Sequence, residues 1–167
     1  MHTLTTQNLT LRPYQRSDFD AYAALMTGPR AQHMGGPHDS DGAWRNFVND
    51  AASFTLNGFG CFIIVEDATP AGFAGMIQPP DFPEPEIGWG LYDGFEGRGI
   101  ITRAARAILD DAFATTGRDS FVSYITPDNA ASIKVAERLG AVRDDAATPP
   151  AGWNSLVYRH TPKGAAA

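Results

Sequence analysis

The fold is decided by the segment Glu86-Ile-Gly-Trp-Gly-Leu-Tyr-Asp-Gly-Phe-Glu-Gly-Arg-Gly-Ile-Ile-Thr-Arg-Ala-Ala-Arg106. It predicts a strand over residues 86–92, then a glycine-rich turn, then a helix. The first turn of such a helix carries backbone N–H groups that have no partner within the helix, at the positive end of the helix dipole. The segment therefore predicts an anion site, and a phosphate is the anion that such sites commonly hold.

Two common phosphate-binding motifs do not fit this segment. Gly94 and Gly99 have the spacing of a Walker loop, but Ile100-Ile101 stands where that loop needs Lys and Ser or Thr. A dinucleotide fingerprint needs three glycines in the order Gly-x-Gly-x-x-Gly, and the third position holds Asp93 or Thr102, depending on where the pattern begins. An acidic residue at that position would repel a pyrophosphate.

A second block follows, Ser123-Tyr-Ile-Thr-Pro-Asp-Asn-Ala-Ala-Ser-Ile-Lys-Val-Ala-Glu-Arg-Leu-Gly-Ala141. Together with Glu96-Gly-Arg-Gly-Ile-Ile101, it resembles two motifs of the GNAT acetyltransferase superfamily, in the same order and at a similar separation. Those motifs are the acyl-CoA loop Gln/Arg-x-x-Gly-x-Gly/Ala and the later block Asn-x-x-Ser/Ala-x-x-Val/Leu-x-Glu-Lys/Arg-Leu-Gly-Phe. The opening Leu9-Thr-Leu-Arg-Pro13, with Asp18, resembles the RimJ/RimL-like branch of ribosomal-protein N-terminal acetyltransferases.

The chain departs from the family pattern at five positions. Ile101 replaces Gly or Ala, Glu96 replaces Gln, Arg or an aromatic residue, and Arg103 stands where relatives often carry Glu. Ala136 stands where many members place a Tyr that protonates the leaving thiolate, and Ala141 replaces Phe. The residue that supports the thiolate must therefore be sought elsewhere.

The resemblance implies an α/β fold of the GNAT type, in which helices flank a mixed, mostly antiparallel sheet with splayed central strands. With 167 residues and no repeat or linker, we expect one domain over residues 1–167. The hydrophobic patterns predict strands over 3–12, 59–67, 70–78, 86–92, 120–126 and 153–160. They predict helices that begin near Ser17, near Asp39 or Ser40, after the glycine turn, and over 129–139, with a proline-rich loop at 79–85.

Composition narrows the function. The net charge of −6 and the pI near 5.0 argue against nucleic-acid binding, which needs a basic face. No apolar run approaches the roughly 18 residues that span a membrane, and no secretory signal is visible at the N-terminus, so we expect a cytoplasmic protein without a membrane role. A single cysteine, Cys61, excludes an internal disulfide and is expected to be a buried strand residue.

The resemblance implies acetyl-CoA as the acyl donor. Its pyrophosphate would lie at the glycine turn and helix start, and its pantetheine arm would lie along the strand and reach the later block. The cofactor contacts expected on this basis are Gly90, Leu91, Tyr92, Gly97, Arg98, Gly99, Ile100, Ile101, Thr102, Asn129 and Ser132. Arg103 and Arg106 either meet the adenosine phosphates or form a solvated helix face.

Residues Glu86, Gly88 and Gly90 share one face of the expected strand, because side chains alternate. The glycines either open a trough for a ligand or admit a close aromatic neighbour or a bulge. Glu86, at the mouth of such a trough, is the candidate general base for deprotonating an amine, or else an ordinary strand-start carboxylate. Glu66 and Asp67 are weaker candidates because they end a hairpin strand.

Two residues are candidates to support the departing thiolate. Ser132 is the nearest donor in the second block, although it could instead cap or back-bond its helix. Tyr124, at the end of the preceding strand, is the other. Asn129 is expected to contact the cofactor arm, to cap the helix, or to do both.

His33 and His38, in a Gly/Pro loop, lack the spacing of a strong metal site, so we expect no metal and a loop that gates a substrate. The sequence thus predicts an N-acetyltransferase that moves an acetyl group from acetyl-CoA to a primary amine by direct attack. The alternatives are a non-catalytic acyl-CoA-binding or sensor module and an interaction protein without a cofactor. The acceptor, a small amine or a protein N-terminus, is left open, as is the choice between a monomer and a homodimer.

Overall fold

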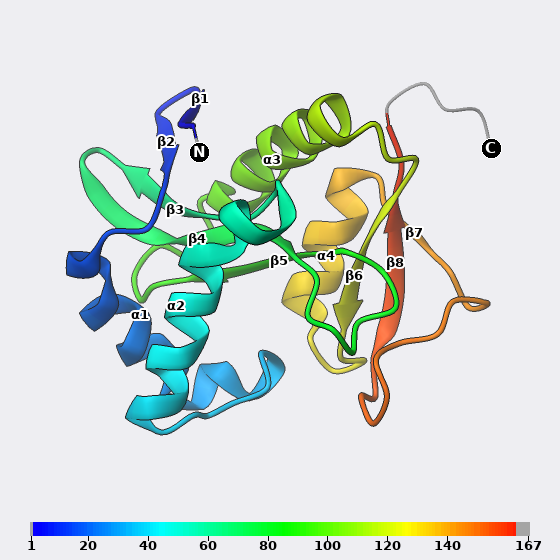
Figure 1. Ribbon diagram of the computed structural model, residues 1–167, viewed down its shortest axis with the longest axis horizontal. Helices are drawn as coiled ribbons and strands as arrows, with labels where there is room; N and C mark the ends of the chain where they lie inside the picture. Colours follow the sequence, from blue (N-terminus) through cyan, green and yellow to red (C-terminus); the bar gives the residue numbers. More distant parts are fainter. Residues whose placement is uncertain (1, 163–167) are drawn as a thin grey trace.

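The strands form one sheet in the order β1-β2-β3-β4-β5-β6-β8-β7, seen in Figure 1. The computed structural model describes residues 2–162. Residues 1 and 163–167 of the expected domain lie outside the described residues. The strands are β1 (Leu4–Thr6), β2 (Leu9–Arg12), β3 (Cys61–Glu66), β4 (Thr69–Ile77), β5 (Glu86–Leu91), β6 (Phe121–Ile125), β7 (Val142–Arg143) and β8 (Leu156–His160). The helices are η1 (Arg16–Asp18), α1 (Phe19–Met26), η2 (Pro29–His33), α2 (Ser40–Asn57), α3 (Ile100–Thr116) and α4 (Ala130–Leu139).

Neighbouring strands run antiparallel except at one place. The pairs β1–β2, β2–β3, β3–β4, β4–β5, β6–β8 and β7–β8 are antiparallel, whereas β5 and β6 are parallel. The parallel pair has a single registered partner pair, Glu86 with Val122, after which the two strands diverge. The expected mixed sheet with splayed central strands is confirmed. We call the opening between β5 and β6 the fork.

Side chains replace the missing ladder bonds at the base of the fork. Val122 N–H still donates to Pro85 C=O at 3.1 Å, but one residue further on Ser123 Oγ donates to Ile87 C=O at 2.8 Å. Tyr124 N–H donates to the carboxylate of Glu86 at 3.2 Å. Because a buried backbone group must find a partner, these two side chains let the strands separate without leaving those groups unpaired.

The helices cover the two faces of the sheet. Helices α1 and α2 pack on one face, over β3 and β4, and the apolar stripe of α3 packs on the other, where α4 lies beside it. Asp39 caps α2 by accepting a hydrogen bond from Gly42 N–H at 2.6 Å, and Gly58 ends that helix in the left-handed conformation. The fork thus has one wall of α3 and α4 and another on the side of α1 and α2.

The structure differs from the sequence prediction in the weakly patterned segments. Residues 3–12 are two short strands joined at Gln7 and Asn8, not one strand, and Gln7 has a positive φ of 49°. The short elements η2 and β7 were not predicted, and the last strand begins at Leu156 rather than at residue 153. Each of these segments is too short for a hydrophobic period to show.

The β3–β4 turn offers a stability test. Asp67 and Ala68 connect Glu66 to Thr69 with positive φ values of 47° and 65°, the conformation of a type I′ turn. A Cβ at the second position is strained, so we expect Ala68→Gly to stabilise the protein by about 0.5–1 kcal/mol. Urea unfolding measures this difference. Ala68→Val, which adds β-branching at the same φ, should destabilise, and equal stability of all three proteins would contradict the turn assignment.

Candidate active site

The start of α3 is built to hold an anion. Gly94, Gly97 and Gly99 have positive φ values of 86°, 74° and 69°, and Gly99 is the N-cap residue. No side chain caps this helix end, and its first turn carries no acidic residue. The side chains of Ile100 and Ile101 are buried, so these residues can offer only their backbone N–H groups to a ligand. Those N–H groups and the helix dipole favour a phosphate.

A buried carboxylate orients two arginines beside this helix start. Glu66, only 6% exposed, lies 3.0 Å from Arg98 Nη1 and 3.5 Å from Arg103 Nη2, and it accepts a hydrogen bond from Asn8 at 3.2 Å. Arg103 also donates to Arg98 C=O at 2.9 Å. The ion pairs leave Glu66 unsuited to act as a base and explain why a carboxylate ends β3. The half-exposed Arg98 has further donors free to face a phosphate.

The turn also carries two acidic side chains that a cation neutralises. Arg30, in η2, contacts Asp93 and lies 2.8 Å from Glu96, whose carboxylate accepts a hydrogen bond from Gly94 N–H at 3.0 Å. This contact joins the helix η2 to the turn that precedes α3. Arg30 therefore offsets the negative charge that would repel a phosphate group.

The edge of β5 that faces the fork carries unpaired backbone groups. Tyr92 N–H donates to Ala71 C=O, on the β4 side, whereas Ile87 C=O faces β6, and backbone direction alternates along a strand. The backbone groups of Trp89 and Leu91 therefore point into the fork, where the registered pairing with β6 has ended. An extended pantetheine arm could add to this edge as a strand would.

The same alternation turns Gly90 and Tyr92 away from the fork. Gly90 pairs with Phe73 of β4, and a Cβ on Gly90 would lie 2.8 Å from the Phe73 ring. Tyr92 is buried in the core under α1 and α2, and its hydroxyl has no hydrogen-bond partner among the described residues. Gly90 thus fits the aromatic-neighbour alternative, and the geometry favours Trp89 and Leu91 over Gly90 and Tyr92 as backbone contacts of the arm. At Gly88 the space is open.

Ser132 lies on the side of the fork that α3 and α4 form. The indole N–H of Trp89 donates to Ser132 Oγ at 3.3 Å, so the serine hydroxyl keeps its own proton to donate elsewhere. Asn129 caps α4 by accepting a hydrogen bond from Ser132 N–H at 3.1 Å, which leaves the side-chain NH₂ of Asn129 for a ligand. Ala136 is fully buried against Ile125 and cannot substitute for Ser132.

Glu86 lies on the opposite face, which we call the acceptor face, beside the open space at Gly88. Burial raises the pKa of Glu86 from its ordinary value of 4.5 to about 8, and the hydrogen bond from Tyr124 N–H only partly offsets this effect. A carboxylate whose pKa lies near the working pH is suited to accept a proton. Strongly shifted carboxylates are common at catalytic sites.

Tyr124 shares the acceptor face with Glu86. Its ring packs against Phe82 of the proline-rich loop at 5.4 Å, and its hydroxyl accepts a hydrogen bond from Glu84 N–H at 3.3 Å. Burial raises the pKa of the Tyr124 phenol. Tyr124 and Ser132 therefore lie on opposite faces of the sheet, so the two candidate donors cannot share one role: Ser132 lies beside Trp89 and Tyr124 lies beside the proline-rich loop.

The loop expected to gate a substrate contacts the segments that follow β5 and β6. His33 Nδ1 lies 2.7 Å from Thr126 Oγ1, directly after β6, while Arg30 reaches the turn after β5. The helix η2 thus bridges the ends of both diverging strands. His38 lies 3.2 Å from Asn46. Within residues 2–162, no group of three or more His, Cys, Asp or Glu side chains is placed to hold a metal ion.

Several site residues were not found from the sequence. Trp89, Ser123, Arg30 and Arg159 act through contacts with residues distant in the chain, which no local motif reveals. His160 is a further example: it is buried, its Nε2 lies 3.1 Å from Ser123 Oγ, and burial lowers its pKa to about 4, so it stays neutral. A signal is present for Trp89, which stands in the strand that opens the fork, and for Ser123, which begins the second quoted block.

The sequence and the fold are similar to those of known proteins. A sequence profile described as an acetyltransferase (GNAT) domain matches residues 8–142. A crystal structure of an acetyltransferase from Agrobacterium tumefaciens is 41% identical, covers 97% of this chain and 95% of its own, and superposes with a TM-score of 0.93. The chain therefore belongs to the GNAT acetyltransferase family.

Two more distant structures share the fold. An acetyltransferase from Salmonella typhimurium that modifies the N-terminal serine of a 50S ribosomal subunit protein is 20% identical, with a TM-score of 0.73 over 94% of this chain and 96% of its own. The microcin self-immunity acetyltransferase MccE, in complex with acetyl-CoA and AMP, is 17% identical, with a TM-score of 0.74 over 94% of each chain. The protein is an acyl-CoA-dependent N-acetyltransferase, and acetyl-CoA is its acyl donor. None of the helices within residues 2–162 is long and apolar enough to cross a membrane.

The helix start can be tested with two matched glycines. Gly99 and Gly117 bound α3 at its two ends, both in the left-handed conformation, with φ values of 69° and 65°. Valine at either position should lower the melting temperature by a similar strain. We expect Gly99→Val also to abolish the rise in melting temperature that millimolar CoA causes, whereas Gly117→Val should keep it. A CoA-induced rise preserved in Gly99→Val would place the phosphate elsewhere.

Proposed function

We propose that the protein acetylates α-amino groups by direct attack of the amine on the thioester of acetyl-CoA, with Glu86 as general base. The observation that carries this proposal is the placement of Glu86 at the base of the fork, with a pKa of about 8, beside the open space at Gly88. The amine nitrogen bonds to the carbonyl carbon, the C–S bond breaks, and the amine proton passes to Glu86. No cysteine takes part, since Cys61 is buried and burial raises the pKa of its thiol.

The two faces of the fork would hold the two substrates. On one face, the N–H groups of Gly99, Ile100, Ile101 and Thr102, with Gly97 and Arg98, hold the pyrophosphate. The backbone of Leu91 and the side chain of Asn129 hold the arm. Leu91 N–H points into the fork, where it can polarise the thioester carbonyl. On the other face, Glu86 and Tyr124 meet the amine, which enters between η2 and the proline-rich loop.

The departing thiolate would be supported by Ser132. Its hydroxyl accepts the Trp89 indole N–H and can donate its own proton toward the sulfur. Tyr124 is the weaker candidate for this role, because its hydroxyl lies at the proline-rich loop on the other face. Ser132 therefore supports the leaving group, and Tyr124 lines the acceptor site.

The pKa of Glu86 favours one class of amine. An α-ammonium group has a pKa of about 8, close to that of Glu86, whereas a lysine side chain has a pKa of about 10.4. Proton transfer to Glu86 is therefore nearly balanced for an α-amine and uphill for lysine. The Salmonella typhimurium neighbour, which modifies an N-terminal serine, supports the same class. We propose a protein N-terminus or another α-amine as acceptor, and a cytoplasmic monomer or homodimer as the working form.

The acceptor class can be tested by measuring release of free CoA with short peptides. We expect turnover with peptides that have a free N-terminus and much less with N-blocked peptides that carry one lysine. Mass spectrometry should place the acetyl group on the α-nitrogen. Equal turnover of both peptide sets would contradict the α-amine preference, and binding of acetyl-CoA without turnover of any amine would favour the non-catalytic alternative.

The role of Glu86 predicts opposite effects on rate and stability. Glu86→Gln removes the base but can still accept the Tyr124 N–H bond. We expect kcat to fall by about 100-fold near pH 8, and less near pH 10, where the amine is already neutral. Because folding raises the pKa of Glu86 from 4.5 to about 8, its contribution to stability is present below pH 4.5 and is lost as pH rises to 8. The variant should therefore gain stability relative to wild type as pH rises.

Rate–pH profiles and melting temperatures of both proteins, from pH 5 to pH 10, measure these effects. Identical rate profiles would make Glu86 a structural residue. A variant that loses stability at high pH would contradict the buried carboxylate.

A further inference from the structure

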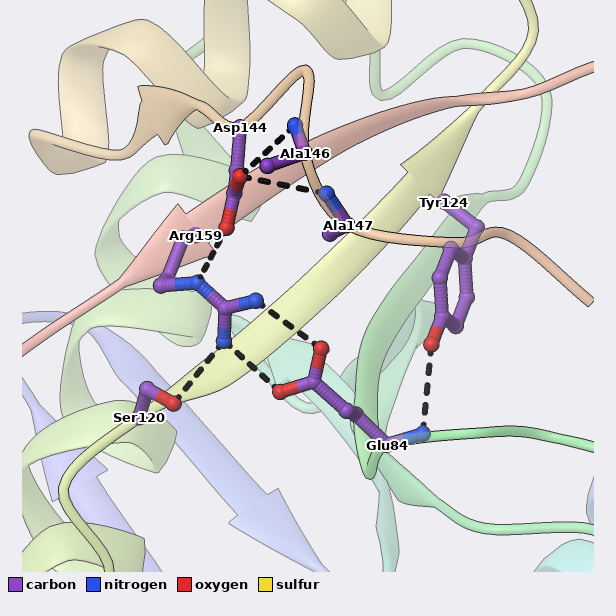
Figure 2. Close-up of polar contacts among 7 residues, drawn as sticks. All are labelled: Glu84, Ser120, Tyr124, Asp144, Ala146, Ala147 and Arg159. Atoms are coloured by element: carbon purple, nitrogen blue, oxygen red, sulfur yellow. Dashed lines mark hydrogen bonds and ion pairs between the residues drawn. The ribbon is translucent and has the colours of Figure 1, made fainter.

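Arg159, on β8, is the centre of a polar network that joins three segments on the acceptor face (Figure 2). Its guanidinium donates to both carboxylate oxygens of Glu84, at 2.7 and 2.9 Å, and to Asp144 at 2.8 Å. It also donates to Ser120 Oγ at 3.0 Å. One side chain thus connects the proline-rich loop, the start of β6 and the loop between β7 and β8.

The network continues on the other side of Asp144. The second carboxylate oxygen of Asp144 accepts hydrogen bonds from Ala146 N–H at 3.1 Å and from Ala147 N–H at 3.2 Å. Asp144 is thereby fixed by its own loop while it holds Arg159. The planar guanidinium of Arg159 binds the Glu84 carboxylate through two parallel hydrogen bonds, a geometry that lysine cannot reproduce.

Residues 84–86 are joined to β6 by three consecutive hydrogen bonds. Glu84 N–H donates to Tyr124 OH at 3.3 Å, Val122 N–H donates to Pro85 C=O at 3.1 Å, and Tyr124 N–H donates to the Glu86 carboxylate at 3.2 Å. Prolines at 83 and 85 restrict the backbone on both sides of Glu84. Any displacement of Glu84 is therefore passed on to Glu86, two residues away.

The network is permanently charged in the range where Glu86 titrates. The hydrogen bond from Arg159 lowers the pKa of Glu84 and that of Asp144, and the two carboxylates raise the pKa of Arg159. The two carboxylates, Glu84 and Asp144, contribute stability above their ordinary pKa values, and this contribution is lost only as pH falls into the acid range. Between pH 6 and pH 10 the network is a fixed clamp and not a switch.

We propose that Arg159 is a positioning residue for acetyl transfer: through Glu84 it holds residues 84–86 so that Glu86 and Tyr124 keep their places on the acceptor face. This inference rests on the proposed role of Glu86. The reaction depends on such positioning, because a displacement of about 1 Å can cost roughly 100-fold in rate. The contacts of Arg159 given above are to Glu84, Asp144 and Ser120, none of which is proposed to hold the cofactor, so its loss should leave acetyl-CoA binding intact.

The test compares three variants with a matched control. Arg159→Met removes the clamp, Arg159→Lys keeps the positive charge without the two parallel hydrogen bonds of the guanidinium, and Glu84→Gln weakens the bidentate pair. The control is Arg143→Met, which breaks the exposed pair between Arg143, on the neighbouring strand β7, and Asp145. Each protein is assayed for kcat, for KM of both substrates, for CoA affinity and for the pH midpoint of kcat, below its melting temperature.

We expect Arg159→Met to lower kcat by roughly tenfold or more, with CoA affinity changed less than about twofold. Arg159→Lys should recover part of the loss, and Arg143→Met should match wild type. The pH midpoint should move down, because a loosened loop admits water to Glu86. The titratable groups around Glu86 are Tyr124, Glu84 and Cys61. The pKa of Glu84 is lowered and the pKa values of Cys61 and Tyr124 are raised, so Glu84 stays ionised and the Cys61 thiol stays neutral where Glu86 titrates.

Wild-type kcat and pH midpoint in Arg159→Met would overturn the proposal, as would a loss of activity that only parallels a loss of CoA affinity. If Arg159→Met does not fold, Glu84→Gln and Arg159→Lys decide by the same criteria. Failure of the base role is recognised separately, because Glu86→Gln would then keep the wild-type profile. In that case amide exchange at Tyr124 decides: faster exchange in Arg159→Met supports the clamp, and unchanged exchange overturns it.

Discussion

The separation of β5 from β6 is the constraint on which the rest of the structure depends. A sheet that stops pairing in its interior exposes backbone donors and acceptors, and burying them unpaired would be costly. The side chains of Ser123 and Glu86 form hydrogen bonds with the backbone groups nearest the branch point, and neutral His160 contacts the Ser123 hydroxyl. Further along, the edge at Trp89 and Leu91 is left for a ligand. The binding site is thus a consequence of how the sheet is interrupted.

The same branch point links binding to chemistry. Glu86 serves the sheet by accepting the Tyr124 N–H bond, and its burial there gives it a pKa suited to a base. A carboxylate in this position lowers stability at neutral and alkaline pH. The same holds for Asp50 of α2, which accepts hydrogen bonds from Tyr14 and Tyr22 and whose pKa burial raises to about 7. Strained or destabilised groups of this kind are often retained where function needs them. The Arg159 network joins the proline-rich loop, which directly precedes the branch point, to β8.

The sequence was informative wherever one segment contains the whole physical cause. The glycine turn and the start of α3, the cap at Asn129, and the apolar stripe of α3 are local features, and they were predicted correctly. The two faces of β5 also followed from strand alternation. Which backbone groups face the fork did not, because this depends on pairing with β4, and so Gly90 and Tyr92 were preferred over Trp89.

Contacts between distant segments cannot be predicted from the sequence for the same reason. Nothing near Glu84 in the chain indicates Arg159, and nothing near Arg30 indicates Glu96. The sequence does not show that Glu66 is neutralised, because the two arginines that pair with it lie more than thirty residues away. A local pattern gives the type of a residue and its element, but the partner that decides its role is set by the topology.

Residue-resolved amide hydrogen exchange on β5, with and without CoA, tests the central claim most directly. If the fork holds the arm, the amides of Trp89 and Leu91 should exchange quickly in the free protein and become protected when CoA binds. Gly90, whose backbone pairs with β4, is the internal control and should be protected in both states. Protection of the helix start at Ile101 without any change at Trp89 and Leu91 would contradict the account, since CoA would then bind without entering the fork.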